Sequence, residues 1–472
     1  MSSGGTLSVA VTGGAGGQVT SNAGGGGGGA GVVDTSTDTL TITKAVTGGA
    51  GGQAVHYAGG GGSGVWVTSA GNVAVTTGSV TGGTGGLGSA TAAVIGGNDN
   101  GGGGAGVVFS AAGATLDVSG QVAGGNISAN TLGMGGIGGA GVNILSGGVK
   151  VTVESGGSIV GGTGGRQPGG AGINSLGASG TGSGGALGGG SFVGSAGGVG
   201  IAGAGGGNTI VTGGVIKGGM AGATQANAIT FSGLVGNNTL ELLSGYSFTG
   251  DVVAAGVLNP NHLVLGGDTS PAASFDVSRI GAALGSNTTA YTGFSSFQKA
   301  GASTWTLAGT TTAVTPWTVS GGTLSVSSDG ALGATSGDLT LDGGTLQNTA
   351  AFTSARAVDL TANGGTLDTA GADLTLSGVI AGHGLLTKEG DGSLILTGFV
   401  LPSGISIAQG TVQVGNGGTV GTIGVDVDVA TSTGTTLAFD HSDTYTFSGA
   451  MSGAGALSQM GTGTLVLTGE NT

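Results

Sequence analysis

Few residues in this sequence have the types and spacing needed for catalysis. The four histidines are His56, His262, His383 and His441. Only His441 has close acidic neighbours, because it lies between Asp440 and Asp443 with Ser442 beside it. Adjacent side chains on a strand point to opposite faces, so this run cannot form a Ser-His-Asp triad by adjacency. His441 and Asp443 could share a face and touch a metal weakly, but a solvated turn is favoured because a site needs convergent partners. No Gly-Asp-Ser-Gly nucleophile motif occurs, and we predict no catalytic residues.

Cofactor and metal sites are also disfavoured. Glycine accounts for 120 of the 472 residues, so glycine-rich nucleotide motifs arise by chance, and no helical periodicity follows any of them. Glycine-rich repeats that bind calcium place aspartate at fixed positions. Here only Asn98, Asp99 and Asn100 form a dense polar group, which is more typical of a turn. We therefore predict neither a metal nor a cofactor.

Aromatic side chains offer a different kind of contact. Tyr57 and Trp66 flank a glycine-rich loop, and we predict them as exposed contact residues on which a sugar could stack. Trp305 and Trp317 occupy alternating apolar positions, a pattern that favours packing in the core or at a cap.

The composition limits the class of protein. Eight basic residues against 22 acidic ones give a net charge of -14, which argues against nucleic acid as a partner. Hydrophobic residues reach 38% while charged residues are 6%, so the chain is expected to fold. Without cysteine there are no disulfides, which suits an exported chain, although many cytosolic proteins also lack cysteine. No signal peptide follows Met1, so we expect that a signal was removed or that the sequence is an excised stretch of a longer chain. No apolar stretch of 18 residues occurs, so we expect no membrane-spanning helix.

The first half of the chain repeats a unit of strand, turn and glycine-rich loop. The unit begins with a small residue, a glycine and an apolar residue, at Gly31, Gly64, Gly106, Gly141, Gly172 and Gly200. Alternating strands follow the first four of these steps, beginning at Thr39, Asn72, Thr115 and Val149. An apolar-x-Gly-Gly turn is expected after each of those strands and once more near the end of the region, at Val46, Val80, Val122, Ile159 and Ile216. The strands predict a stack of coils, each with one buried face.

The glycine runs at residues 24–29, 59–62 and 101–104 carry no side chains that could pack. They either flex or are held by main-chain hydrogen bonds to the neighbouring loop. One form of the second alternative is a stack of extended polyglycine segments akin to polyproline II.

The second half of the chain repeats more tightly. Gly-Gly-Thr-Leu occurs three times, and its leucines, Leu324, Leu346 and Leu367, are 22 and then 21 residues apart. That spacing is suitable for one turn of a β-helix whose successive strands stack in parallel about 4.8 Å apart.

Three longer stretches carry a family resemblance. KAGASTWTLAG from Lys299, KEGDGSLILTG from Lys388 and QMGTGTLVLTGENT from Gln459 resemble the autotransporter-associated strand repeat of Gram-negative type V secretion passengers. Together with the sequence that precedes them, these stretches extend the resemblance over roughly residues 237–472. The glycine-rich half resembles such passengers only in its general character. The resemblance implies a right-handed parallel β-helix that is displayed outside the cell through its own C-terminal outer-membrane barrel. With neither a signal nor a barrel in the sequence, a passenger fragment is expected.

We therefore predict an all-β protein, a right-handed parallel β-helix (solenoid) with glycine-rich loops. The expected domains are glycine-rich coils at 1–219, junction coils at 220–296 and strand repeats at 297–472. The predicted function is that of an extracellular, surface-displayed passenger that acts in adhesion or cell-to-cell self-association, by binding copies of itself or a host-cell ligand. The first alternative is a stalk that presents another module. The second is a hydrolase acting on polysaccharide or protein, and the scarcity of clustered carboxylates argues against it.

Overall fold

The computed structural model is all-β, and it divides into two compact units. Unit 1 comprises Met1–Asn261 and Gly281–Phe294, and unit 2 comprises His262–Ile280 and Ser295–Thr472. The predicted domain boundaries at 219 and 296 stay a prediction. The structure describes residues 5–19, 24–54, 58–88, 101–127, 136–164, 197–256, 258–268, 272–285, 288–429 and 434–472.

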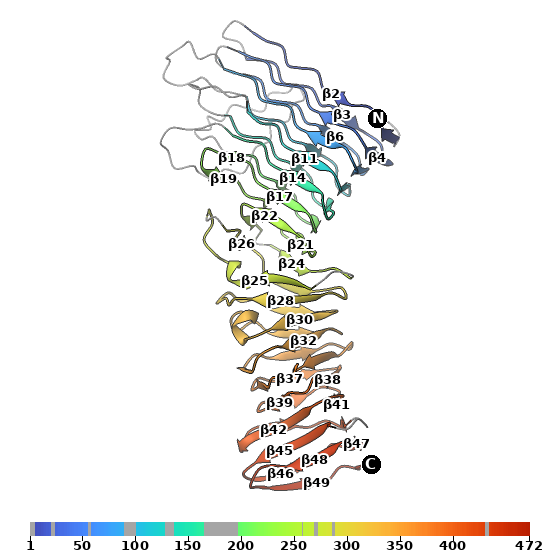
Figure 1. Cartoon of the computed structure of the whole chain (residues 1–472), viewed down its shortest axis with the longest axis vertical. Helices are drawn as coiled ribbons and strands as arrows, with labels where there is room; N and C mark the ends of the chain where they lie inside the picture. The colour runs from blue at the N-terminus through green and yellow to red at the C-terminus, as the bar shows by residue number, and fades with distance from the viewer. Residues whose placement is uncertain are drawn as a thin grey trace. The chain divides into compact units, whose positions relative to one another are not determined.

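Unit 1 is built from three parallel sheets, and each coil of the chain gives one strand to each sheet before it returns to the first (Figure 1). The first sheet contains, in pairing order, β1 (Gly5–Leu7), β4 (Thr39–Ile42), β7 (Asn72–Val75), β10 (Thr115–Val118), β13 (Lys150–Val153), β16 (Thr209–Thr212) and β21 (Thr239–Leu242). The second contains β2 (Val11–Thr12), β5 (Val46–Thr47), β8 (Ser79–Thr81), β11 (Gln121–Ala123), β14 (Ser158–Val160), β17 (Val215–Lys217) and β22 (Ser247–Thr249). The third contains β3 (Val32–Asp34), β6 (Val65–Val67), β9 (Val107–Phe109), β12 (Val142–Ile144), β15 (Ile201–Gly203), β20 (Ile229–Phe231), β23 (Val252–Ala254) and β26 (Tyr291–Thr292). A small antiparallel pair, β18 (Met220–Ala221) and β19 (Thr224–Gln225), lies apart from them.

Alternation of apolar residues decides which face of each strand is buried. Leu40 pairs with Val73, and Leu116 pairs with Val73 on its other side, all with fully buried side chains. The strands expected at Thr39, Asn72, Thr115 and Val149 are thus confirmed. Burying a column of such side chains contributes about 1.5–3 kcal/mol for each residue, which is the main force that holds the coils together.

The apolar-x-Gly-Gly segments are strands, so their prediction as turns was wrong. Val46 pairs with Val80, Val80 with Val122, Val122 with Ile159, and Ile159 with Ile216, and these side chains are fully buried. Two or three extended residues are enough to continue a ladder when the neighbouring coils supply the partners. The predicted step at Gly172 lies outside the described residues, and Val142 pairs directly with Ile201.

A ladder of buried asparagines crosses one corner of unit 1. Asn208, Asn238 and Asn261 are at most 1% exposed and precede strands in three successive coils. The Asn208 main-chain N–H and Nδ2 donate to Asn238 Oδ1 at 3.1 and 3.2 Å. The corresponding groups of Asn238 donate to Asn261 Oδ1 at 3.2 and 2.9 Å. Each amide therefore satisfies polar groups of the preceding coil, which pins the register of the corner.

Replacing Asn238 with alanine is expected to lower the free energy of unfolding by about 2–3 kcal/mol, because it leaves the Asn208 main-chain N–H buried without an acceptor and removes one of the two bonds of Asn208 Nδ2. Asn363 provides the matched control, since its side-chain bond to Asp342 Oδ1 is exposed. Asn363→Ala should change stability by less than about 1 kcal/mol. Denaturant titration measures the free energy of unfolding of both variants. Equal losses would show that the buried ladder contributes no more to stability than an exposed hydrogen bond does.

Unit 2 also consists of parallel sheets with one strand per coil (Figure 1). One sheet runs through β24 (His262–Leu265), β27 (Ser296–Lys299), β29 (Trp317–Val319), β31 (Leu339–Leu341), β34 (Val358–Leu360), β37 (Ile380–Gly382), β40 (Phe399–Leu401) and β43 (Thr422–Ile423). A second runs through β25 (Ala273–Asp276), β28 (Thr304–Ala308), β30 (Thr323–Val326), β32 (Thr345–Asn348), β35 (Gly365–Asp368), β38 (Leu385–Glu389), β41 (Gly404–Ile407), β44 (Val427–Val429) and β47 (Met451–Gly453). A third runs through β33 (Phe352–Ser354), β36 (Leu374–Leu376), β39 (Ser393–Leu396), β42 (Thr411–Gly418), β45 (Thr436–His441) and β48 (Ala456–Gln459). The last pair is β46 (Thr444–Phe447) and β49 (Thr464–Leu467), and the 3-10 turns are η1 (Val277–Arg279) and η2 (Asp329–Leu332).

The Gly-Gly-Thr-Leu repeat is confirmed as one coil. Leu324 pairs with Leu346 and Leu346 pairs with Leu367, in three successive strands of one sheet. Trp305 and Trp317 are 0% and 1% exposed, which confirms their prediction as core residues. The Trp305 indole N–H donates to the Gly266 carbonyl at 2.9 Å, so this core position also satisfies its polar atom.

Lys299 and Lys388 are fully buried in the core columns of unit 2, and each closes a corner between two sheets. The Lys388 ammonium donates to the carbonyls of Glu389, Gly390 and Gln409 at 2.8, 2.7 and 3.1 Å. Lys299 makes the corresponding three bonds at 2.7, 2.9 and 3.0 Å. In the third similar stretch Gln459 takes this place, and its Nε2 donates to the carbonyls of Gly461 and Gly463. The first two stretches thus share one corner geometry although they lie on different sheets, whereas Gln459 is exposed and bonds only carbonyls of its own turn.

We expect unit 2 to become more stable as the pH rises from 8 to 9.5. Burial lowers the pKa of Lys299 and of Lys388 from 10.5 to about 8, against the opposing effect of nearby carboxylates such as Asp268 and Asp368. Between those values the unfolded chain binds more protons than the folded chain, so the free energy of unfolding increases with pH. Because solvent partly screens the corner, we expect the free energy of unfolding to increase by on the order of 1 kcal/mol per lysine.

Denaturant titrations at pH 7 and 9.5 test this expectation. Lys388→Met should remove part of the pH dependence, whereas Lys150→Met, which removes an exposed lysine of β13, should leave it intact. A flat profile in the unmodified protein would contradict the prediction.

Arg356 organises the turn that contains η2. Its side chain is 1% exposed, and its Nε lies 2.9 Å from Asp329 Oδ1. Its two terminal nitrogens donate to the carbonyls of Asp329, Gly333, Ala334 and Gly337. One planar guanidinium therefore fixes the main chain of the whole turn that contains η2.

Candidate interaction surface

The glycine-rich segments of unit 1 form ordered arms that leave the coils and return to them. Each outgoing arm follows a strand of the second sheet, and each return arm precedes a strand of the third. The described outgoing arms are residues 13–19, 48–54, 82–88, 124–127 and 161–164, and the return arms are 24–31, 58–64, 101–106, 136–141 and 197–200. The parts of the loops that join each pair lie outside the described residues.

Parallel arms of successive coils are joined by hydrogen bonds at every third residue. Gly48 N–H donates to the Thr81 carbonyl at 2.9 Å, and Gly51 N–H donates to that of Thr84 at 2.8 Å. In the return arms, Gly61 N–H donates to the Gly102 carbonyl and Gly64 N–H to that of Ala105. A period of three is that of the polyproline II helix, not of a β-strand.

Outgoing and return arms are also bonded to each other. Gly62 N–H donates to the Gly49 carbonyl at 2.8 Å, Gly83 N–H to that of Gly62 at 2.7 Å, and Gly104 N–H to that of Gly83 at 2.8 Å. The arms therefore make two layers that are crosslinked through the main chain. This confirms, for the described residues, the alternative in which main-chain hydrogen bonds hold the glycine runs.

Close approach of the two layers explains why most arm residues are glycine. A Cβ added to Gly83 would overlap the main chain at Gly48 and Gly49, far inside the 3.0 Å that real Cβ atoms respect. In the outgoing arms from residue 48 onward, the first two residues of a Gly-Gly-x triplet are limited in this way, whereas the third points outward. At Gly27, an outward-facing position, an added Cβ would meet only the Gly60 carbonyl oxygen, at 3.8 Å.

The outward positions of the outgoing layer show what this surface can do chemically. Ala50 and Leu87 are half-buried, while Gln53 and Thr84 are exposed. These groups and the main chain between them offer neutral hydrogen-bonding and small apolar contacts, without charge or nucleophiles. Such a surface is suitable for many weak contacts rather than for a single catalytic pocket.

Of the two predicted contact residues, Trp66 is described by the structure. Tyr57 lies outside the described residues. Trp66 is the central residue of β6 and points outward, half-buried, with its indole N–H donating to Ser110 Oγ at 3.1 Å. Neither its proposed contact role nor that of Tyr57 is tested by this geometry.

His441 is not on a solvated turn, so that part of its prediction was wrong. It ends β45, is 3% exposed, and its ring centroid lies 4.4 Å from that of Tyr445. Its Nδ1 lies 3.3 Å from Asp443 Oδ1, as a shared face requires. Burial raises the pKa of the Tyr445 phenol, whose oxygen bonds the Ile423 main chain. Packing of Phe439, Tyr445 and Phe447 explains why a histidine is buried here.

The other histidines are not brought together in the described residues. His262 begins β24, His383 is exposed after β37, and His56 lies outside the described part of the chain, as do Asn98, Asp99 and Asn100. Across the described ranges, no group of three or more His, Cys, Asp or Glu side chains could hold a metal ion. In the same ranges, no helix is long and apolar enough to cross a membrane.

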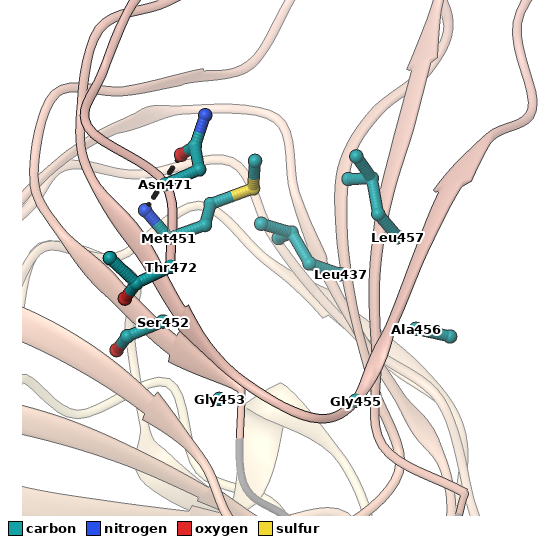
Figure 2. A pocket seen from close by; sticks show the side chains of 9 residues that line it. All are labelled: Leu437, Met451, Ser452, Gly453, Gly455, Ala456, Leu457, Asn471 and Thr472. Atoms are coloured by element: carbon teal, nitrogen blue, oxygen red, sulfur yellow. Dashed lines mark hydrogen bonds between the residues drawn. The ribbon is translucent and has the colours of Figure 1, made fainter.

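A shallow hollow of about 220 Å³ lies in unit 2, between β45, β47 and β48 (Figure 2). Its wall is largely apolar, with the side chains of Leu437, Met451 and Leu457 around it. Asn471 Oδ1 accepts a hydrogen bond from the Met451 N–H at 2.9 Å. No acidic or basic side chain lines the hollow, so no side chain in its wall could act as a general base on the hydroxyls of Ser452 and Thr472.

Comparisons with known proteins add one relative. No protein-family model matches the chain, and no solved structure matches it. Over 218 residues, 46% of this chain, it is 30% identical to the adhesin BmaC autotransporter of Brucella suis biovar 1 (strain 1330). The matched stretch covers only 6% of that protein's length. Over this stretch the chain is therefore similar to an autotransporter adhesin, which supports an autotransporter passenger but not a particular strand-repeat family.

Proposed function

We propose that this chain is part of a surface-displayed passenger that acts in adhesion or cell-to-cell self-association, and that the coils of each unit form a right-handed parallel β-helix. The observation that carries the proposal is the two-layer stack of glycine arms. It is an ordered surface of main-chain and small polar groups, repeated once per coil. The similarity to an autotransporter adhesin supports the same class of function and an exposed or secreted location.

A stalk is the second candidate, and unit 2 favours it. Beyond the first, its coils are shorter than those of unit 1, for example 22 and 21 residues between Leu324, Leu346 and Leu367, and buried side chains such as Lys388 close the corners internally. We propose that unit 2 supports the glycine arms rather than binding a partner itself. The hydrolase alternative has no catalytic arrangement to support it in the described residues.

Display on a non-aggregating bacterium tests the adhesive role of the arms. Settling of the cells and attachment to surfaces are compared for the unmodified chain and for the variants Gly83→Ala and Gly27→Ala. We expect Gly83→Ala, which disrupts the two layers, to reduce both readouts, and Gly27→Ala to preserve them. Unchanged settling and attachment in Gly83→Ala, at equal display, would refute the assignment to the arms.

A further inference from the structure

The outward face of the third sheet of unit 1 carries an aromatic side chain whose orientation is fixed. Trp66 pairs with Val33 on one side and with Val108 on the other, so these three side chains form one outward-facing column. The Trp66 indole N–H donates to Ser110 Oγ, two residues beyond Val108 on the neighbouring coil. To reach that hydroxyl, the indole must extend across the neighbouring strand at Val108. Val108 is only 5% exposed although it points outward, and Asn143, its partner on the next coil, is equally buried.

Ser110 is itself held in place, which makes the platform rigid. Its hydroxyl donates to the Val67 carbonyl at 3.0 Å, and its main-chain N–H donates to the same oxygen at 3.0 Å. One face of the indole is therefore backed by the sheet, and the ring has lost its rotational freedom before any ligand arrives. Such preorganisation reduces the entropy that binding must remove.

A row of hydroxyl groups runs beside the platform. Thr35, Thr68 and Ser110 follow the three column residues by two positions, face the same way and are exposed. The Thr68 hydroxyl donates to the Asp34 carbonyl at 3.2 Å, so its oxygen keeps acceptor capacity toward a ligand. The main-chain positions of the column and of the hydroxyl row are about 6–7 Å apart along the strand, and the indole reaches the row at Ser110.

We propose that Trp66 and this hydroxyl row bind a neutral glycan through an equatorially substituted hexopyranose unit. Such a sugar has a flat C–H face for the indole and hydroxyl groups at its edge that can bond Thr68 and Ser110. The two outward columns described here carry no charged side chain, and the chain has a net charge of -14, so anionic glycans, phospholipids and nucleic acids are disfavoured. The proposal rests on the adhesive function proposed above and gives it a ligand class.

Calorimetric titration of the whole chain with cellopentaose and with chitotetraose tests the proposal. We expect dissociation constants near about 1 mM for a single stacked sugar. Trp66→Phe, which keeps an aromatic ring on Val108, should weaken binding about 10-fold, and Ser110→Ala should weaken it less by freeing the indole. Phe399→Ala, at an exposed aromatic residue of unit 2, is the matched control and should bind as the unmodified chain does.

Tryptophan emission gives a second readout, because the other two tryptophans are buried in unit 2. A sugar-induced change should be present in the unmodified chain and absent in Trp66→Phe. No heat and no emission change with either sugar at about 20 mM, or equal binding by Trp66→Phe, would overturn the proposal. Attachment of displayed cells is scored separately: sugar binding without attachment would refute the adhesive function alone, and attachment without sugar binding would refute the glycan site alone.

Discussion

Replacing Gly83 with alanine is expected to separate the two layers of glycine arms around that coil. The added methyl group would overlap the main chain at Gly48 and Gly49, and no rotation of a side chain can relieve the overlap. Overpacking against a side chain costs about 1–3 kcal/mol, and a clash with rigid main chain exceeds that range. We therefore expect a loss of more than about 3 kcal/mol in the local stability of the arms.

Hydrogen exchange measures this effect at the amides of Gly62, Gly83 and Gly104, which bond from one layer to the other. Their exchange should accelerate by more than about 100-fold in Gly83→Ala, since each 1.4 kcal/mol corresponds to tenfold. Gly27→Ala is the matched control, because its methyl group would make only an ordinary contact with the Gly60 carbonyl oxygen, at 3.8 Å. That variant should gain about 0.4–1 kcal/mol from a less flexible unfolded chain. Slow exchange in both variants would mean that glycine is dispensable in the layers.

Removing the guanidinium of Arg356 is expected to unfold the turn that contains η2. Arg356→Met leaves Asp329 and the carbonyls of the turn without their donor, and breaking a buried ion pair on one side costs about 3–5 kcal/mol. Arg356→Lys should recover only part of this, because an ammonium lacks the planar set of donors. Denaturant titration measures the loss, and faster proteolysis within residues 329–337 should accompany it.

The chain contains its own control for this experiment. Arg279 Nε lies 3.0 Å from Asp276 Oδ2, nearly the distance found for Arg356 and Asp329, but these side chains are 37% and 43% exposed against 1% and 17%. Exposed pairs contribute about 0–1 kcal/mol. Arg279→Met should therefore leave stability nearly unchanged, and a loss as large as that of Arg356→Met would show that burial is not what matters.

Period-two alternation made the coils of unit 2 predictable. Leu324, Leu346 and Leu367 follow the same turn at nearly equal spacing, so their pairing could be read from the sequence. The segments at Val46 and Val80 were misjudged because two or three residues are too few to display a period. The Gly-Gly-x triplets of the arms were a readable signal, since a period of three in glycine indicates polyproline II packing.

Buried polar residues were the features that the sequence did not predict. Asn238 and Lys388 look like surface residues, because part of what compensates their burial, Asn261 and the Gln409 carbonyl respectively, lies one coil away. Nothing in the local sequence identifies those partners. Trp66 was singled out by residue type, and its contact role stays a prediction; its orientation depends on Ser110, which is 44 residues distant.

In each parallel sheet of the described residues, a strand pairs only with the strand of the preceding coil and that of the following coil. Each new coil therefore pairs with a segment that is close to it in sequence, wherever the coil lies in the chain. The coil formed last is the template for the next one. Folding by this route resembles the growth of a filament from its end, so its barrier per coil does not increase with the total length. A protein of this design can be lengthened by whole coils without becoming harder to fold.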